Sequence, residues 1–220
     1  MTPSDEIVDL HVSDAAEIAE LIARVFAAEV EITWWLVPDD IATRTRLLRE
    51  QFTMVIRAAF DSGGRVQGIR RGGRLDAAAV WSIHSGGPVT ESPGYDAALR
   101  AITGVHYGRF RALDCTFRET TSEAPHHHLE LLAADPRGEG MGTRLVKNYL
   151  DWADRQRGFP EIHLHASSGN AARLYARLGF HTGDPAEVPG SGQLFVYPMR
   201  RHPPAAVPPS GEAEVSVLRP

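Results

Sequence analysis

The sequence has little of several features that would each define a class of protein. Its single cysteine, Cys115, excludes an internal disulfide and is compatible with a reducing compartment. No apolar run approaches the roughly 20 residues that a membrane-spanning helix needs. The first ten residues carry neither the basic nor the apolar stretch of a secretory signal. We therefore expect a cytoplasmic protein with no membrane partner.

An excess of positive charge is also missing. The 220 residues carry a formal net charge of -5, which disfavours general binding of nucleic acid. The acidic residues gather near the start, where residues 1–40 hold ten Asp and Glu and one arginine, Arg24. The plain interpretation is a solvated helix face. The sharper interpretation is attraction of a cationic amine substrate.

Length and composition fit one globular domain followed by a tail. Hydrophobic residues make up 43% and charged residues 23%, close to the globular average. We predict a domain over residues 1–200 and a proline-rich tail over 201–220. The final segment EVSVLRP would suit an edge strand added to a neighbouring chain, so a homodimer stays open.

The spacing of apolar residues predicts helices first and a mixed sheet after them. Residues 13–29 have helical spacing after a cap at Ser13, with Glu17 near the capping-box position. A second helix is expected to run from a cap at Asp39 or Asp40 to about Phe60. The further predictions are a hairpin over 65–84, mostly helix over 95–119, strands over 126–134, 161–166 and 193–199, and helices over 143–156 and 170–179. Two strand-to-helix crossovers inside an otherwise antiparallel pattern indicate an α/β fold with a mixed, mostly antiparallel central sheet flanked by helices.

Three alternating glycines stand between a predicted strand and a predicted helix, in the segment Asp135-Pro-Arg-Gly-Glu-Gly-Met-Gly-Thr. Glycine permits positive φ and close approach to the backbone. Successive N–H groups at a helix start bind anions, and Arg137 can add a charge-assisted contact. The loop therefore predicts a pyrophosphate site, although a turn that only closes strand onto helix is the structural alternative. It lacks the Gly-Lys-Ser/Thr of a P-loop, and its glycine order does not fit a dinucleotide fingerprint.

Two motifs together resemble the GNAT superfamily of acetyltransferases. The run from Arg137 to Gly142 is similar to its R/Q-x-x-G-x-G/A acyl-CoA loop, and the run from Asn170 to Phe180 to its N-x-x-x-x-Y-x-x-x-G-F helix. The likeness covers roughly residues 126–181, and the overall layout most resembles small-molecule enzymes of the puromycin N-acetyltransferase type. One departure is that Arg137 follows Pro136 directly, where the family usually has two more residues. The resemblance implies a GNAT fold and acetyl-CoA as the donor.

The resemblance also implies roles for individual residues. The backbone at the end of the strand over 126–134 would bind the pantetheine arm where the next strand diverges. Tyr175 would be the general acid for the CoA thiolate, its alternative being a core aromatic. Asn170 would start its helix and bind the cofactor through its amide. The expected cofactor contacts are Leu132, Ala133, Ala134, Arg137, Gly138, Glu139, Gly140, Met141, Gly142, Thr143 and Asn170.

His128 and Glu130 are candidates for the general base. They are two apart on a predicted strand, so they share a face, and Leu132 follows on the same face. A histidine titrates close to neutral pH, whereas a glutamate would act through a water or with a raised pKa. We expect at least one of them to take the proton, the alternative being that both only line a polar pocket.

The run His126-His127-His128 raises the question of a metal. Adjacent strand residues point to opposite faces, so only His126 and His128 could converge. No cysteine cluster or His-Glu helix pair accompanies them. We therefore expect no metal. His163 and His165 on the next strand also share a face, and we interpret them as structural.

Four aromatic residues are candidates for the acceptor site. Trp34, Trp35, Trp81 and Tyr107 are candidates for an aromatic acceptor pocket, with core packing as an equal alternative. Three functions remain open: acetylation of a small-molecule amine such as an antibiotic or metabolite, acetylation of protein N-termini or lysines, and silent binding of acyl-CoA. The silent module would not need His128, Glu130 and Tyr175, which favours an enzyme. A closed aromatic pocket would favour a small molecule and an open groove a peptide.

Overall fold

The computed structural model describes residues 6–88, 91–156 and 159–202. The predicted tail therefore lies outside the described residues from residue 203 on. The strands are β1 Glu6–Asp9, β2 Val66–Arg71, β3 Arg74–His84, β4 His126–Ala134, β5 Glu161–Ala166, β6 His181–Thr182, β7 Ala186–Glu187 and β8 Phe195–Arg201. The α-helices are α1 Ala15–Glu29, α2 Glu31–Leu36, α3 Ile41–Asp61, α4 Tyr95–Thr103, α5 Tyr107–Thr120, α6 Met141–Ala153 and α7 Gly169–Ala176.

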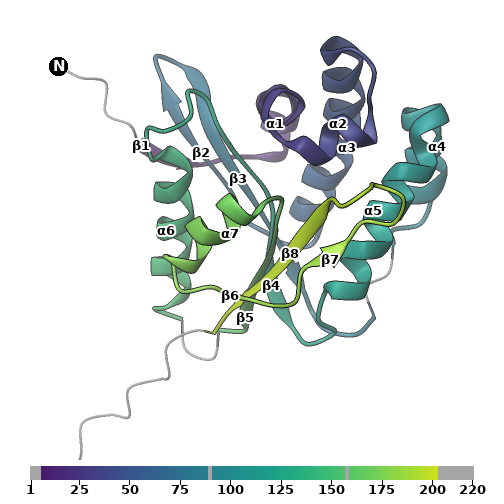
Figure 1. The fold of residues 1–220 in the computed structure, drawn as a ribbon. Helices are drawn as coiled ribbons and strands as arrows, with labels where there is room; N and C mark the ends of the chain where they lie inside the picture. Colours follow the sequence, from purple (N-terminus) through teal and green to yellow (C-terminus); the bar gives the residue numbers. More distant parts are fainter. Residues whose placement is uncertain (1–5, 89–90, 157–158, 203–220) are drawn as a thin grey trace, which may run out of the picture.

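One mixed sheet organises the molecule. Its strand order is β1-β2-β3-β4-β5-β8-β6, with β7 paired to β8. Among the strand pairs of the described residues, only β4–β5 is parallel. Helices α1 to α5 lie on one face of the sheet, and α6 and α7 lie on the other (Figure 1). The predicted α/β class and the mostly antiparallel sheet are confirmed. None of the described helices is long and apolar enough to cross a bilayer.

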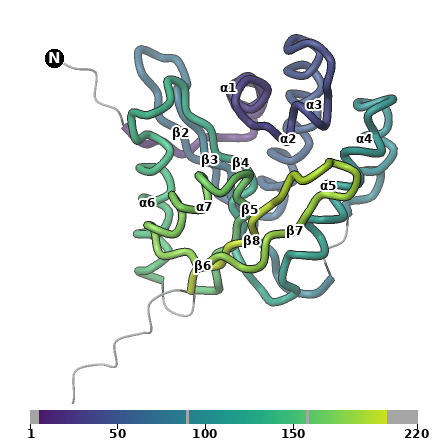
Figure 2. Tube along the Cα trace, in the orientation of Figure 1, coloured from purple at the N-terminus to yellow at the C-terminus, as the bar shows by residue number. Residues whose placement is uncertain are grey.

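The chain path explains why the core has two parts. Figure 2 shows the first half of the chain forming α1, α2 and α3 on one side of the sheet, and the later α6 and α7 on the other. Alternate residues of β3 therefore enter different clusters. Ala78 and Val80 pack against α1 and α3, whereas Trp81 packs under α6. Both faces of the central strands are thereby buried, which holds β4 rigidly in place.

Of the two predicted helix caps, one is confirmed and one is wrong. Asp40 caps α3, since its Oδ1 accepts hydrogen bonds of 2.9 Å from the N–H groups of Ala42 and Thr43. The predicted cap at Ser13 is wrong. Ser13 lies inside a short 3₁₀ turn, and α1 begins only at Ala15. Glu17 forms an ion pair with Arg70 instead of completing a capping box.

Several shorter elements differ from the predictions. The predicted helix over 95–119 is divided, because Gly104 adopts a φ of 52° that ends α4. The aromatic segment around Trp34 is helical as α2. Strands β1, β6 and β7 have only two to four residues, too few to show an alternating pattern.

Strand β4 holds the two features that shape the site. Along β3 it is paired over its whole length, but along β5 only His126–Leu129 are paired. The two parallel strands therefore fork after Leu129. The register with β3 also shifts at Glu130, since Trp81 opposes Leu129 and Val80 opposes Leu131. This bulge changes the alternation of side chains. Leu132 consequently packs under α6 and not on the face of His128, contrary to the prediction.

Candidate active site

A cavity of about 240 Å³ lies between the ends of the central strands and the α4–α5 pair. Its floor comes from β3, β4 and β5 and its wall from α5 and the segment leading into α4. The residues that line it are His84, Glu91, Tyr95, Asp114, Phe117, Arg118, Thr121, His128, Leu129, Glu130 and His165. Of the predicted site residues, it brings together His128 and Glu130.

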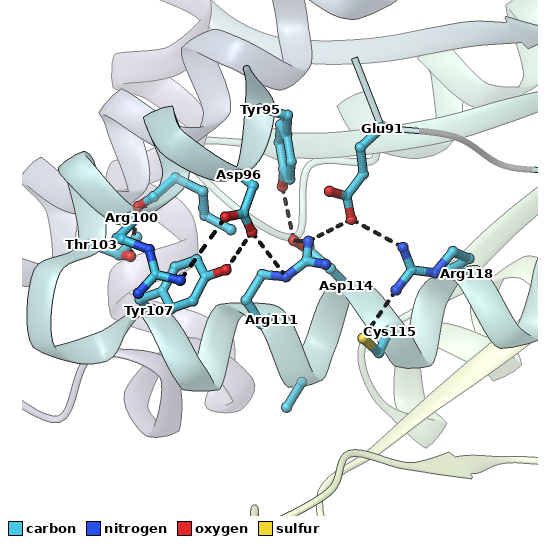
Figure 3. Close-up of polar contacts among 12 residues, drawn as sticks. Glu91, Tyr95, Asp96, Arg100, Thr103, Tyr107, Arg111, Asp114, Cys115 and Arg118 are labelled. Carbon is cyan, nitrogen blue, oxygen red and sulfur yellow. Dashed lines mark hydrogen bonds and ion pairs between the residues drawn. The ribbon is translucent and has the colours of Figure 1, made fainter. Parts of the chain in front are cut away.

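The wall of the cavity is a network of charged and hydroxyl groups between α4 and α5 (Figure 3). The Tyr95 hydroxyl donates a 3.0 Å hydrogen bond to Asp114. Glu91 is held between Arg111 and Arg118. Burial raises the pKa of Asp114 to about 6, against the lowering effects of the Tyr95 hydrogen bond and of Arg111. The wall is therefore polar and fixed in place.

Glu130 stands on the floor at the bulge in β4. Its carboxylate accepts a hydrogen bond from Ser82 and lies 3.6 Å from Nε2 of His84. Burial would raise the pKa of this carboxyl, but His128, His84 and Ser82 together hold it below its ordinary value. Glu130 is therefore ionised at neutral pH. An ionised carboxylate in a cavity of this size suits a cationic or proton-donating ligand.

Histidines from three strands surround this floor. The pairing register places His84 opposite His126 and His163 opposite His128, so all four share one face of the sheet. The His126 ring stacks on His84 and on His163, with centroid distances of 4.5 and 4.2 Å. His165 lies over His128 at 5.2 Å. Burial lowers the pKa of His128 to about 4, so its imidazole is neutral near pH 7.

His127 points the other way, as the alternation of a strand requires. Its Nδ1 hydrogen-bonds the hydroxyl of Tyr149 on α6, so this middle histidine belongs to the core under α6. The expectation that only His126 and His128 converge among the three consecutive histidines agrees with this placement.

The fork between β4 and β5 leaves an open strand edge. Beyond Leu129, no strand within the described ranges bonds the β5 side of β4. Leu132, Ala133 and Ala134 form this edge, where the pantetheine arm is expected. Their side chains pack into the two cores, so only their backbone groups are available to a ligand.

The glycine loop lies directly after this edge. Gly138 and Gly140 adopt φ values of 86° and 76°, and Gly140 is the residue before α6. A Cβ built on either would meet nothing within 4 Å, and one on Gly142 would only touch Leu132 at 3.5 Å. The loop is thus open on its outer side at the start of a 13-residue helix. Met141 is buried, so the loop offers its backbone N–H groups and the adjoining Thr143.

The charged residues of the loop have partners on neighbouring elements. Arg137 forms a 2.8 Å ion pair with Glu29 of α1, and Glu139 pairs with Arg71 of β2. The Arg137 and Glu29 side chains are 64% and 49% exposed. Exposed pairs of this kind contribute little stability. Arg137 can therefore leave Glu29 and bind an anion with little loss of stability. An open edge, an open glycine loop and a helix start together fit a CoA pyrophosphate and pantetheine arm.

Helix α7, which carries the second motif, packs beside β5, β6 and β8. Ser168 caps α7 by accepting from the N–H of Ala171 at 3.2 Å. Asn170 is therefore not the cap, and its side-chain oxygen accepts from Arg173. Tyr175 is 8% exposed, and burial raises the pKa of its hydroxyl above the ordinary value. The phenol is protonated at neutral pH, as a proton donor must be.

The predicted aromatic pocket is not assembled. Trp81 is fully buried and stacks on Tyr149 with ring centroids 3.8 Å apart, so its assignment to an acceptor pocket is wrong. Trp34 is 44% exposed on α2. Trp35 donates to the carbonyl of Gly190, and the Tyr107 hydroxyl donates to Asp96. None of the four lines the cavity, because α2 and the start of α5 lie outside it.

Sequence reasoning missed most of the cavity wall. Glu91, Tyr95 and Asp114 carry no motif, and they meet only because α4 folds back against α5. His84 is also unmarked in the sequence, since its position beside His126 depends on the β3–β4 register. A polar stripe at every second position of the strands was the one signal that could have found the histidines.

Comparisons with known proteins give one family match and several similar folds. Residues 117–201 match the family described as Acetyltransferase (GNAT) domain. The comparison with curated proteins gives no match. A Corynebacterium glutamicum structure, described as histone acetyltransferase HPA2 and related acetyltransferase, has a TM-score of 0.65 and 24% identity, covering 95% of this chain and 99% of that one.

Two more solved structures are similar over nearly their whole length. The structure of yncA from Salmonella typhimurium with its cofactor acetyl-CoA has a TM-score of 0.53 and 18% identity, covering 94% of this chain and 98% of that one. A mosquito arylalkylamine N-acetyltransferase like 5b has a TM-score of 0.54 and 17% identity, covering 89% and 99%. At such identities the likeness establishes the fold. The resemblance to puromycin-type enzymes stays a prediction.

Proposed function

We propose that this chain, whose residues 117–201 match the GNAT acetyltransferase domain, is an acetyl-CoA-dependent N-acetyltransferase whose acceptor is the primary amine of a small molecule. The observation that carries this proposal is the cavity of about 240 Å³ with the Glu130 carboxylate on its floor. Small-molecule sites are concave with a few converging polar groups, as here. A peptide acceptor would instead need an extended groove.

The reaction is direct attack of the amine on the thioester. Acetyl-CoA supplies the activated acetyl group. The amine nitrogen forms the new bond to the acetyl carbon, the carbon–sulfur bond breaks, and the amine loses one proton. The N–H groups on the open edge of β4 orient the donor, and one of them donates to the thioester oxygen.

Two proton transfers accompany the reaction, one from the amine and one to the leaving sulfur, and different residues carry them out. Glu130, ionised and hydrogen-bonded by Ser82, accepts the amine proton through a water, with the neutral His128 beside it as the other acceptor. Tyr175 on α7 donates a proton to the leaving sulfur. Arg137, Asn170 and the glycine loop hold the phosphates and the CoA arm.

Known proteins with this fold are compatible with a small acceptor. The mosquito protein is by name an arylalkylamine N-acetyltransferase, and a Drosophila melanogaster protein of similar fold is a polyamine N-acetyltransferase that forms N-acetylagmatine. The Corynebacterium structure carries a histone acetyltransferase name, so the protein acceptor is the alternative that an experiment must separate.

The test is release of free CoA thiol from acetyl-CoA with three sets of acceptors: arylalkylamines, polyamines, and peptides with free N-termini or lysines. We expect turnover with a small amine and only background release with peptides. Glu130→Gln should lower kcat/KM by about 100-fold, within the range for a lost general base. The matched control is Glu161→Gln on the neighbouring strand, outside the cavity. Turnover on peptides alone, or equal loss in both variants, would contradict the proposal.

A further inference from the structure

The cluster of histidines on β3 and β4 has a geometry that the acetyl transfer does not require. One ring nitrogen or other ligand atom from each of His84, His126 and His128 lies within 4.8 Å of the other two. His126 and His128 are 0% and 6% exposed. We propose that these three imidazoles form a binding site for a divalent transition-metal ion such as Zn²⁺ on the floor of the cavity.

Two of the ring nitrogens are buried without a partner. His126 Nε2 and His128 Nδ1 have no hydrogen-bond partner in the part of the chain that the structure describes. Buried polar atoms are normally satisfied, because leaving them unpaired costs stability. A metal ion in the space between the rings would accept a lone pair from each imidazole and remove this cost.

The hydrogen bonds around the cluster orient the lone pairs. Nδ1 of His126 lies 2.8 Å from the carbonyl oxygen of Ala124. A carbonyl can only accept, so Nδ1 carries the hydrogen and Nε2 carries the lone pair. Histidines that ligate metals are commonly fixed in this way through their second nitrogen. The Glu130 carboxylate, 3.6 Å from His84 Nε2, supplies a negative charge next to the ion.

The distances and ligand type select the class of ion. Zinc–nitrogen bonds of about 2.1 Å place tetrahedral ligand atoms about 3.4 Å apart. The His84 ring lies parallel to the His126 ring, at an interplanar angle of 3°, so it must rotate out of this stack to aim a nitrogen at the ion. His84 can make this movement because its side chain is 30% exposed and it is the last residue of β3. Imidazole ligands favour zinc, copper and nickel over magnesium or calcium.

Three imidazoles leave one of four coordination positions for a water or an amine. His84 and His128 line the cavity, so we place this position on the cavity side, next to Glu130. The consequence for catalysis rests on the proposed function: an ion there would compete with the acceptor amine and raise its apparent KM, while the KM for acetyl-CoA would change little.

The direct test is titration of Co²⁺ into the untagged, metal-free full chain, followed by visible absorption and then displacement by Zn²⁺. We expect one ion per chain and a Co²⁺ spectrum of nitrogen ligation. His84→Gln and His126→Gln should each weaken Co²⁺ binding by at least about tenfold. The matched control is His165→Gln, which changes another histidine of the same cavity outside the three ligands and should bind like the wild type.

Three results would overturn the metal site: no stoichiometric Co²⁺ binding, affinity unchanged by His84→Gln, or an equal loss in His165→Gln. His84 is at a strand end and partly exposed, so its variant is expected to fold, and far-ultraviolet circular dichroism checks this. Because the spectrum reads binding without turnover, an enzyme that fails to acetylate any amine would still give a clear answer about the metal.

Discussion

The two halves of β4 perform different tasks because they are bonded differently. His126–Leu129 is paired with strands on both sides, whereas the second half, residues 130–134, is paired with β3 only. The doubly paired half, which we call the closed half, fixes side chains, and it carries the histidines of the cavity floor. The singly paired half, which we call the open half, leaves backbone groups free, and it leads into the glycine loop. Glu130 stands at the boundary, where the bulge turns it toward the cavity.

The two halves of β4 therefore offer different kinds of contact to a ligand: backbone groups in one half and side chains in the other. In the proposed function, backbone groups of the open half would hold the acetyl donor, and side chains of the closed half would hold the acceptor. Mutations should therefore affect stability, donor binding, turnover and pH dependence separately, depending on which half they reach.

The largest expected effect is a loss of stability when the core that packs against the closed half of β4 is changed. Trp81 opposes Leu129 and stacks on Tyr149. Trp81→Ala should lower the free energy of unfolding by about 3–5 kcal/mol, as for other buried aromatics. Urea unfolding measures this. Trp34→Ala, at a 44% exposed position, is the control and should cost about 1 kcal/mol or less. Equal losses would show that Trp81 is not a core residue.

Blocking the open half should abolish donor binding. Gly140→Asp places a side chain at a φ of 76° and a negative charge at the expected phosphate site. Calorimetric titration should show acetyl-CoA affinity lower by at least about 100-fold, about 2.7 kcal/mol. The control is Gly190→Asp, which has the same φ of 76° and equally open surroundings. An unchanged affinity in Gly140→Asp would mean that the loop does not hold the phosphates.

Removing the proposed proton donor should slow turnover without weakening the donor complex. Tyr175→Phe is expected to lower kcat by about 100-fold, because only the phenol proton is lost. Acetyl-CoA affinity should stay within about tenfold. Tyr149→Phe removes another buried phenol, one that serves the core. Turnover unaffected by Tyr175→Phe at every pH would reject the assignment.

The last expected effect, on the pH dependence of stability, concerns the cavity wall. Burial raises the pKa of Asp114 to about 6 from its ordinary 3.8, with Tyr95, Arg111, Glu91 and Arg118 as the neighbouring groups. The folded state then binds more protons than the unfolded state between pH 4 and 6. Stability is therefore lost as pH rises through this window and is level above it. Asp114→Asn should remove a fall of about 3 kcal/mol from the unfolding profile. Parallel profiles for the two proteins would contradict the burial of this carboxyl.

The second half of the chain was the more predictable one. The strand over 126–134 agrees with β4 and the strand over 161–166 with β5, because flanking proline and glycine residues mark their ends locally. The cofactor side follows from these elements, since its motif is continuous in sequence.

The acceptor side could not be predicted in the same way. Its wall depends on how α4 and α5 meet, and its floor on the register that brings His84 beside His126. The bulge at Glu130 is also invisible locally, and it moved Leu132 to the opposite face. The tryptophans were predicted to form an acceptor pocket because aromatic side chains occur both in protein cores and in ligand sites.

The central claim is that the donor lies along the open half of β4. Amide hydrogen exchange of the full chain, with and without acetyl-CoA, tests it directly. The account predicts new protection over residues 130–143, with little change over 126–129, which is already paired on both sides. Bound acetyl-CoA with no added protection over 130–143, or with protection confined to other elements, would contradict it.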